Sequence, residues 1–381
     1  MKKLSLYYAT NRKHMGKNRW APRSYGTEFS RDGMQNLRFG EVTVSADEDR
    51  IERCLKRNTG YGEGDGEKLS TYLSKLAGSQ KTSKIKAYFE KLQDDCPDSH
   101  QPSDARWGRD QMFGNIQKEM IGGKDVLVYI HGFNVEWKQA VGATLALQEM
   151  LNRKSGIPTQ EVMVVLFSWP SDGNALPFVS YKSDREDARG SGSSFGRAFL
   201  KLRDFLMDLR RGTDSHPICK QKFHLLCHSM GNYVLQNALD RIIMFTPRGT
   251  MPRIFENIFM CAPDVDDNVL EPGNAMGRLH EICRGVNVYY NRGDVAMHVS
   301  DYTKGNPDRL GTNGAARPSM LHTKMKQVDC SDIIDGFVEH SYYLSGRIND
   351  DIRLTIADEP QGPSFRSRTV VQGVHNSWIM R

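Results

Sequence analysis

Five apolar segments of strand length recur from the middle of the chain onward, and patterns typical of amphipathic helices separate the first four. Such alternation indicates a mostly parallel sheet that is covered by helices on both faces. Chemistry in these sheets collects at the carboxyl ends of the strands. Polar or glycine-containing residues follow each segment, so the sequence predicts a functional site at that edge. The expected strands are residues 126–130, 162–167, 223–227, 258–261 and 286–290, and the expected helices are residues 137–151, 195–209 and 233–244.

The third apolar segment runs into a serine, Ser229, and a glycine follows two positions later. This is the pattern of a nucleophile elbow, in which a strand turns sharply into a helix and raises the serine hydroxyl out of the sheet. Because the backbone at such a serine is strained, we expect Cys227 and Gly231 to pass close together and to need small side chains. Ser229 is therefore the candidate nucleophile. The alternative for this motif alone is a buried strand that happens to contain serine.

A serine nucleophile needs a histidine base, and that histidine needs a carboxylate that fixes its tautomer. When the serine lies at such an elbow, the acid and the histidine follow it in that order along the chain. Asp294 comes a short turn after the expected strand at 286–290, which favours it as the acid. Asp264, which follows the preceding strand, is the alternative.

The candidate base is His340, which follows a short expected strand at 326–330 and a turn rich in Ser and Asp. A last strand followed by a loop with a histidine is what this arrangement requires. His322 is the alternative.

The negative charge that forms during attack on a carbonyl group needs two backbone N–H donors. One is expected from Met230, at the start of the helix after the serine. The other is expected in the His-Gly-Phe-Asn loop at 131–134, where Gly132 lets the chain turn and the amide of Phe133 faces the cavity. The residues expected to line the substrate pocket are His131, Asn134, Trp169 and His228. For Trp169, a position in the core beneath a loop is an equally good alternative.

Composition argues against several other classes of protein. The formal charge of +6 comes from 52 basic and 46 acidic residues without a basic block, so we expect no nucleic-acid partner. No segment has the length of a membrane-spanning helix, and the seven cysteines have no metal-ligand spacing. We therefore expect a cytoplasmic protein without an integral membrane segment, a metal or an organic cofactor.

The 381 residues can hold one large α/β domain with extensions, or two ordinary domains. Residues 1–50 are expected to add strands to the sheet, at 4–9 and 42–45, and residues 121–345 to form the catalytic core. Residues 51–120 are interpreted as a helical insertion or cap, which also offers a surface for a protein partner. Residues 346–381 are expected to form a polar C-terminal tail. The helical interpretation of residues 51–120 rests on apolar residues at helical spacing, namely Leu69, Tyr72, Leu73, Leu76, Ile85, Tyr88, Phe89 and Leu92.

Taken in order, these motifs resemble the α/β hydrolase superfamily, and more narrowly the esterase/lipase-like proteins catalogued as domain of unknown function 900. The resemblance covers about residues 4–13 and 120–345. It implies Ser229 as nucleophile, Asp294 as acid and His340 as base, in agreement with the reasoning from position. The region at 51–120 is larger than the family pattern implies. The motifs that carry the resemblance are residues 8–12, 131–134, 167–171, 228–232, 262–266, 291–294 and 340–343.

We therefore expect a serine hydrolase that cleaves a carboxylic ester, with a small-molecule or lipid-like acyl ester as substrate and an acyl-enzyme intermediate. A lipase, thioesterase or amidase would use the same triad. From a different class, the chain could be a non-catalytic interaction protein built on a hydrolase scaffold.

Overall fold

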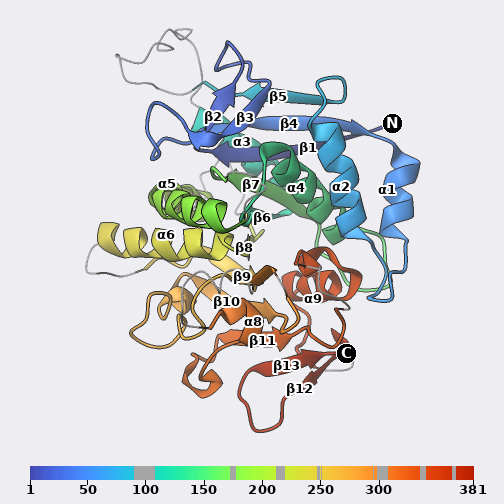
Figure 1. Cartoon of the computed structure of the whole chain (residues 1–381), viewed down its shortest axis with the longest axis vertical. Coiled ribbons are helices and arrows are strands. Elements are labelled where there is room, and N and C mark those ends of the chain that lie inside the picture. The colour runs from blue at the N-terminus through green and yellow to red at the C-terminus, as the bar shows by residue number, and fades with distance from the viewer. Residues whose placement is uncertain are drawn as a thin grey trace.

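The computed structural model describes residues 1–89, 108–171, 177–211, 219–246, 249, 251–294, 296–297, 308–334, 340–362 and 366–381. An 11-stranded sheet runs through the centre, with helices against both of its faces (Figure 1). The mostly parallel α/β fold expected from the sequence is confirmed. In spatial order the strands are β12 (Arg368–Val370), β13 (Ser377–Met380), β11 (Met325–Asp329), β10 (Cys283–Tyr290), β9 (Phe255–Cys261), β8 (Phe223–His228), β6 (Asp125–Ile130), β7 (Val162–Ser168), β1 (Lys2–Thr10), β4 (Arg38–Ala46) and β5 (Ser83–Ala87).

Every neighbouring pair of strands from β13 to β1 is parallel, so the carboxyl ends of these strands lie at one edge of the sheet. The outermost strands run the other way: β4 is antiparallel to β1, β5 to β4, and β12 to β13. Strands β2 (Arg12–Met15) and β3 (Ser24–Phe29) form a separate two-stranded sheet. All five strands expected from apolar segments are present as β6 to β10.

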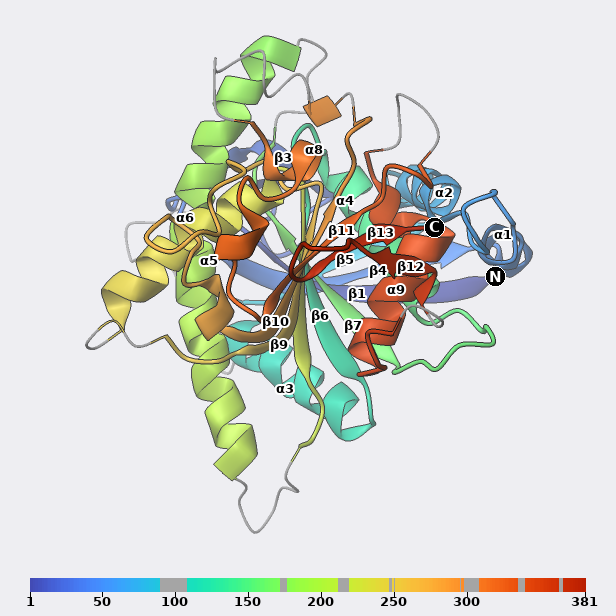
Figure 2. The same ribbon diagram turned by 90° about the horizontal axis from the view of Figure 1, so that it is seen from below.

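The helices divide between two hydrophobic clusters on opposite faces of the sheet. Figure 2 shows α5 and α6 on one side, and α1, α2 and α9 on the other. The first cluster takes side chains from α3 (Gly108–Ile121), α5 (Pro177–Arg211) and α6 (Gly231–Phe245). The second takes them from α1 (Glu48–Leu55), α2 (Gly66–Ala77), α4 (Trp137–Leu151) and α9 (Gly346–Ile356). Shorter helices are Leu279–Glu281, α8 (Leu310–Asn313), Pro318–Met320 and Tyr342–Leu344.

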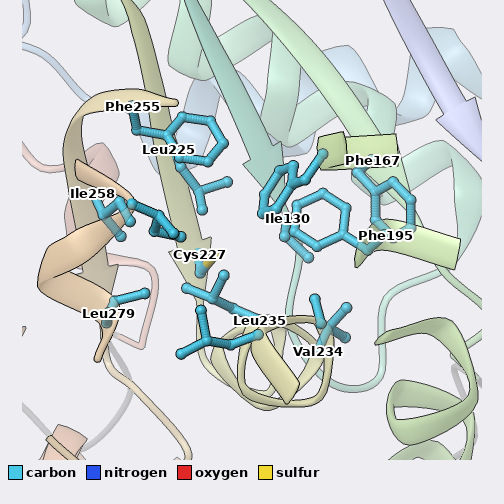
Figure 3. Packing of buried hydrophobic residues seen from close by; sticks show 14 of the residues in the cluster. Ile130, Phe167, Phe195, Leu225, Cys227, Val234, Leu235, Phe255, Ile258 and Leu279 are labelled. Carbon is cyan, nitrogen blue, oxygen red and sulfur yellow. The ribbon is translucent and has the colours of Figure 1, made fainter. Parts of the chain in front are cut away.

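The packing of α6 against β8 fixes the start of this helix at the end of the strand. Each aliphatic or aromatic side chain that is fully buried contributes about 1.5–3 kcal/mol, so this contact is held firmly. Strands β6 to β9 supply one side of the contact, and α5 and α6 supply the other (Figure 3). The labelled side chains of this packing include Ile130, Phe167, Phe195, Leu225, Cys227, Val234, Leu235, Phe255 and Ile258.

Helix α5 begins at Pro177, well before the residue 195 at which the sequence predicts it. The early part of this helix is polar and contains glycine, which resembles a loop in sequence. In the structure Gly192 allows α5 to approach α6 closely. A Cβ atom added at Gly192 would lie 2.5 Å from Cβ of Asn237 and 3.0 Å from the backbone N of Ala238.

The helical interpretation of residues 51–120 is wrong at Ser83–Ala87, which form β5 at one edge of the sheet. In this segment Ile85 stands between Lys84 and Lys86, an alternation of period two that suits a strand with one face toward solvent. Lysines are also typical of edge strands, because they discourage pairing with another chain. The expected helical residue Leu92 lies outside the described residues. Helices α1 and α2 of this region pack on the face of the sheet.

The C-terminal segment is not a tail, because α9, β12 and β13 all belong to the fold. Asp351 of α9 is fully buried and forms ion pairs of 3.2 Å with Arg366 and Arg368. Tyr289 of β10 donates a hydrogen bond of 2.6 Å to the same carboxylate. A polar sequence therefore joins the sheet through a buried ionic cluster, which no apolar periodicity indicates.

Within the described ranges, no helix combines the length and the apolar character that a bilayer span requires.

Candidate active site

Ser229 lies in the turn between β8 and α6 with a φ of 52°, in the left-handed region that residues other than glycine rarely adopt. Backbone hydrogen bonds hold it there. Its N–H donates to the carbonyl of Cys261 at 2.9 Å, and its own carbonyl accepts from the N–H of Asp264 at 3.2 Å. The side-chain amide of Asn232 donates to the same carbonyl at 3.0 Å. The surrounding structure thus maintains a strained serine at the end of a strand, as in a nucleophile elbow.

The need for Gly231 comes from the neighbouring strand. A Cβ atom added at this position would lie 2.7 Å from the carbonyl oxygens of both Ile130 and His131. The crowding expected between Cys227 and Gly231 is therefore a contact between the start of α6 and the end of β6. Cys227 is fully buried, and burial raises the pKa of its thiol well above the ordinary value, which keeps the thiol neutral and unreactive.

Asp294 and His340 are joined by a hydrogen bond of 2.7 Å from Nδ1 of the imidazole to Oδ2 of the carboxylate. Asp294 follows β10 and is only 3% exposed. Its other oxygen, Oδ1, accepts from the N–H of Ala296 at 3.1 Å. The carboxylate is therefore held from both sides, and it directs the Nδ1 proton of His340 toward itself.

The two alternatives from the sequence lie in other contacts. Asp264 accepts a hydrogen bond of 2.8 Å from the hydroxyl of Tyr181 and lies 3.5 Å from Nε of Arg309. The ring of His322 is stacked on that of His280, with centroids 3.9 Å apart. The structure pairs Asp294 with His340 and gives neither alternative the same geometry.

A contact from β8 brings His340 beside the elbow. Nε2 of His228, the residue before Ser229, donates to the carbonyl oxygen of His340 at 3.1 Å, and the two ring centroids are 4.6 Å apart. The bonded pair of Asp294 and His340, which are 46 positions apart in the chain, thus contacts the residue that precedes Ser229.

The loop after β6 is fixed by side chains from three distant segments. A Cβ atom added at Gly132 would lie 2.7 Å from Cβ of Ser229, so only glycine fits where the loop approaches the serine. Four hydrogen bonds hold the loop and determine where it directs its N–H groups. They are Arg12 Nη2 to the Val135 carbonyl at 2.7 Å, Trp169 Nε1 to the His131 carbonyl at 2.9 Å, Asn134 N–H to Asp184 at 3.0 Å and Val135 N–H to Ser171 at 3.1 Å.

The N–H groups of Phe133 and Met230, the expected oxyanion donors, have no hydrogen-bond acceptor among the described residues. The side chain of Phe133 is half-buried, and its ring meets that of Tyr181 edge to face at 5.7 Å. Met230 lies in the turn from which α6 begins, and its side chain is fully buried. Within the described residues, neither amide is therefore engaged in another hydrogen bond.

Of the four residues expected in the pocket, Asn134 alone has an exposed side chain. Trp169 is fully buried and supports the loop through its indole N–H, which favours the core alternative. His131 is also fully buried, and burial together with the nearby Arg12 lowers its pKa to about 3. Its Nδ1–H donates to the Gly132 carbonyl at 2.9 Å, and its Nε2 accepts from Arg12 at 3.2 Å. His131 and Trp169 therefore act as supports of the loop.

Three residues of the site, Arg12, Asn232 and Tyr181, have no role predicted from the sequence. Arg12 belongs to one of the motifs that carry the family resemblance, and that motif is the only signal that marked it. Its contact with His131 spans 119 positions and depends on the pairing of β7 with both β1 and β6. Asn232 follows the elbow directly, where a buried amide that holds the turn could have been inferred. In the part of the chain that is described, no three His, Cys, Asp or Glu side chains form a cluster able to hold a metal ion.

No curated protein matches the chain. Among solved structures it is similar to lipase B of Aspergillus fumigatus, with 11% identity and a TM-score of 0.36 over 72% of this chain and 61% of the lipase. It is also similar to phospholipase PlaB from Legionella pneumophila in complex with thio-NAD, with 17% identity and a TM-score of 0.23 over 58% of this chain and 41% of that chain. The chain thus matches less than two thirds of the length of the lipase and of the phospholipase.

A family model described as "Alpha/beta hydrolase of unknown function (DUF900)" matches residues 109–352, which is more than half of the chain. The chain therefore belongs to this family of α/β hydrolases.

Proposed function

We propose that the chain is a serine hydrolase that cleaves carboxylic esters, with Ser229 as nucleophile, His340 as general base and Asp294 as the acid that orients the base. The observation that carries this proposal is the 2.7 Å hydrogen bond between Nδ1 of His340 and Asp294, beside a strained serine at the end of a strand. A serine hydroxyl is a weak nucleophile at neutral pH, and such a pair is what activates it.

The reaction proceeds in two halves. Nε2 of His340 takes the hydroxyl proton of Ser229 while Oγ attacks the ester carbonyl carbon, which gives a tetrahedral intermediate with a negative oxygen. The intermediate collapses, the bond to the alcohol breaks, and His340 gives its proton to the leaving alcohol. Water then repeats the sequence on the acyl-enzyme, with His340 again as base, and releases the carboxylic acid and the free serine.

The negative oxygen of each intermediate is bound by the N–H groups of Phe133 and Met230, which are free of other acceptors in the described structure. One such donor typically contributes about 3 kcal/mol to the lowering of the barrier. The bonds that hold the loop are therefore part of the catalytic arrangement, because a donor is effective only when it already points at the position of the oxygen.

The half-buried ring of Phe133, which packs edge to face on the buried ring of Tyr181, offers an apolar contact beside the proposed oxyanion position and supports an acyl group as the bound part of the substrate. We propose a small-molecule or lipid-like acyl ester as substrate. The chemistry uses only side chains, backbone N–H groups and water, so no metal or organic cofactor takes part in the proposed steps.

The test is turnover of a series of p-nitrophenyl acyl esters of increasing chain length by the wild-type protein, Ser229→Ala and a matched control. Ser155→Ala is the control, because Ser155 is an exposed loop serine. We expect Ser229→Ala to lose turnover by at least about 10³-fold and the control to equal the wild type. Turnover in Ser229→Ala at the wild-type rate would exclude the proposed mechanism.

A further inference from the structure

His228 is the last residue of β8 and the chain neighbour of Ser229, and it is buried with 5% exposure. A carbonyl oxygen can only accept, so the contact of 3.1 Å between its Nε2 and the carbonyl of His340 requires the proton on Nε2. The ring of Tyr343 packs against the imidazole at 4.9 Å, and that of His340 at 4.6 Å. The imidazole of His228 is therefore fixed in position and in tautomer.

His340 has two bonds in the described structure, and they hold different parts of the residue. Its ring donates to Asp294, and its carbonyl accepts from His228. The first bond sets the orientation of the imidazole, whereas the second sets the position of the backbone that carries it. The short helix Tyr342–Leu344 begins two residues later, so the bond from His228 lies where the chain enters the site.

We propose that His228 is a positioning residue, which holds the backbone of His340 at the distance that proton transfer from Ser229 requires. This inference rests on the proposed function. Ser229 and His228 are adjacent in the chain, so the bond ties the general base directly to the segment that carries the nucleophile. A displacement of about 1 Å in such an arrangement can lower the rate by about 10²-fold.

Histidine suits this position because it is a donor that stays neutral. Burial and the nearby His340 and His131 all lower the pKa of His228 well below its ordinary value. When His340 takes the serine proton and becomes positive, a neutral neighbour adds no repulsion. A lysine or arginine would donate the same bond but would place a second positive charge beside the imidazolium.

The test compares three substitutions that separate the bond from the packing. In His228→Gln the side-chain amide nitrogen takes the place of Nε2. In His228→Asn it reaches only the place of Nδ1, and in His228→Phe the ring remains without a donor. We measure kcat and KM for a p-nitrophenyl ester, together with the melting temperature of each variant.

We expect His228→Gln to lose at most about threefold in kcat, and His228→Asn and His228→Phe to lose about 10- to 100-fold with KM changed less than about threefold. A purely structural role would make the loss follow the melting temperature and not the reach of the donor. Equal kcat in the Gln and Phe variants, whether high or low, would overturn the proposal.

A measurement on the wild-type protein serves if a variant fails to fold. ¹⁵N NMR of the labelled histidines at pH 7 reports which ring nitrogen of His228 carries the proton. We expect the neutral form with the proton on Nε2, and the proton on Nδ1 would overturn the proposal. A wild-type protein that cleaves no ester refutes the proposed function, and the positioning role falls with it. Normal wild-type turnover with unaffected Asn and Phe variants refutes the positioning role alone.

Discussion

Replacing Asp294 with asparagine should abolish catalysis without disturbing the fold, and the structure indicates why. Oδ1 of Asp294 accepts from the N–H of Ala296, so the amide oxygen of asparagine remains on that side and its NH₂ group turns toward His340. The amide then donates to Nδ1, which moves the imidazole proton to Nε2. In that tautomer Nε2 no longer accepts the proton of Ser229. The opposite orientation of the amide would place its NH₂ group against the N–H of Ala296 and is disfavoured.

The loss from a reversed tautomer in a serine triad is about 10⁴-fold in kcat, which corresponds to about 5 kcal/mol in the barrier. The assay is steady-state hydrolysis of a p-nitrophenyl ester, with thermal unfolding to confirm the fold. Asp264→Asn is the matched control, because Asp264 bonds to Tyr181 and not to His340. It should lose less than about tenfold in kcat. A loss of less than about tenfold in Asp294→Asn, or equal losses in both variants, would refute the reasoning.

Three further results are expected. Gly231→Ala should lower the free energy of unfolding by about 1–3 kcal/mol and reduce turnover, because the new Cβ atom would lie 2.7 Å from the carbonyl oxygens of Ile130 and His131. Wild-type behaviour in urea unfolding and ester hydrolysis would contradict this. Since the folded state lowers the pKa of His131 to about 3, the unfolded chain takes up its proton first, and stability falls as pH drops below about 6.5, by about 2 kcal/mol at pH 5. Urea unfolding at both pH values checks this, and an unchanged pH slope in His131→Asn would speak against it. Asp351→Asn should cost about 3–5 kcal/mol in unfolding free energy, because the charge of Arg366 stays buried without its partner, and a cost below about 1 kcal/mol would disprove it.

The sequence alone predicts the centre of this fold well, because the periodicity of buried strands is local. Strands β6 to β10 are buried along most of their length, so their apolar segments are continuous and easily found. The same method fails where burial is achieved in another way. Helix α5 packs through glycines such as Gly192, and β12 joins the sheet beside a buried ion pair of Arg368 with Asp351.

The candidate triad could be proposed from order along the chain, since Asp294 and His340 follow strands in the succession that the fold requires. The supports of the site could not be found in this way. Arg12, Trp169 and His228 act through hydrogen bonds to backbone carbonyls of segments far away in the sequence. A hydrogen bond to a backbone carbonyl places no demand on the identity of the accepting residue. A motif can therefore mark the donor, but the sequence does not show which segment the donor contacts.

The central claim is that Ser229 is an activated nucleophile, and covalent labelling tests it most directly. A fluorophosphonate probe reacts with a serine only when a base removes the hydroxyl proton and N–H donors bind the phosphonyl oxygen. The protein is treated with the probe, digested and analysed by mass spectrometry. We expect one adduct, on the peptide that contains Ser229, and none in Ser229→Ala. An unlabelled wild-type protein, or an adduct at another serine, would contradict the account.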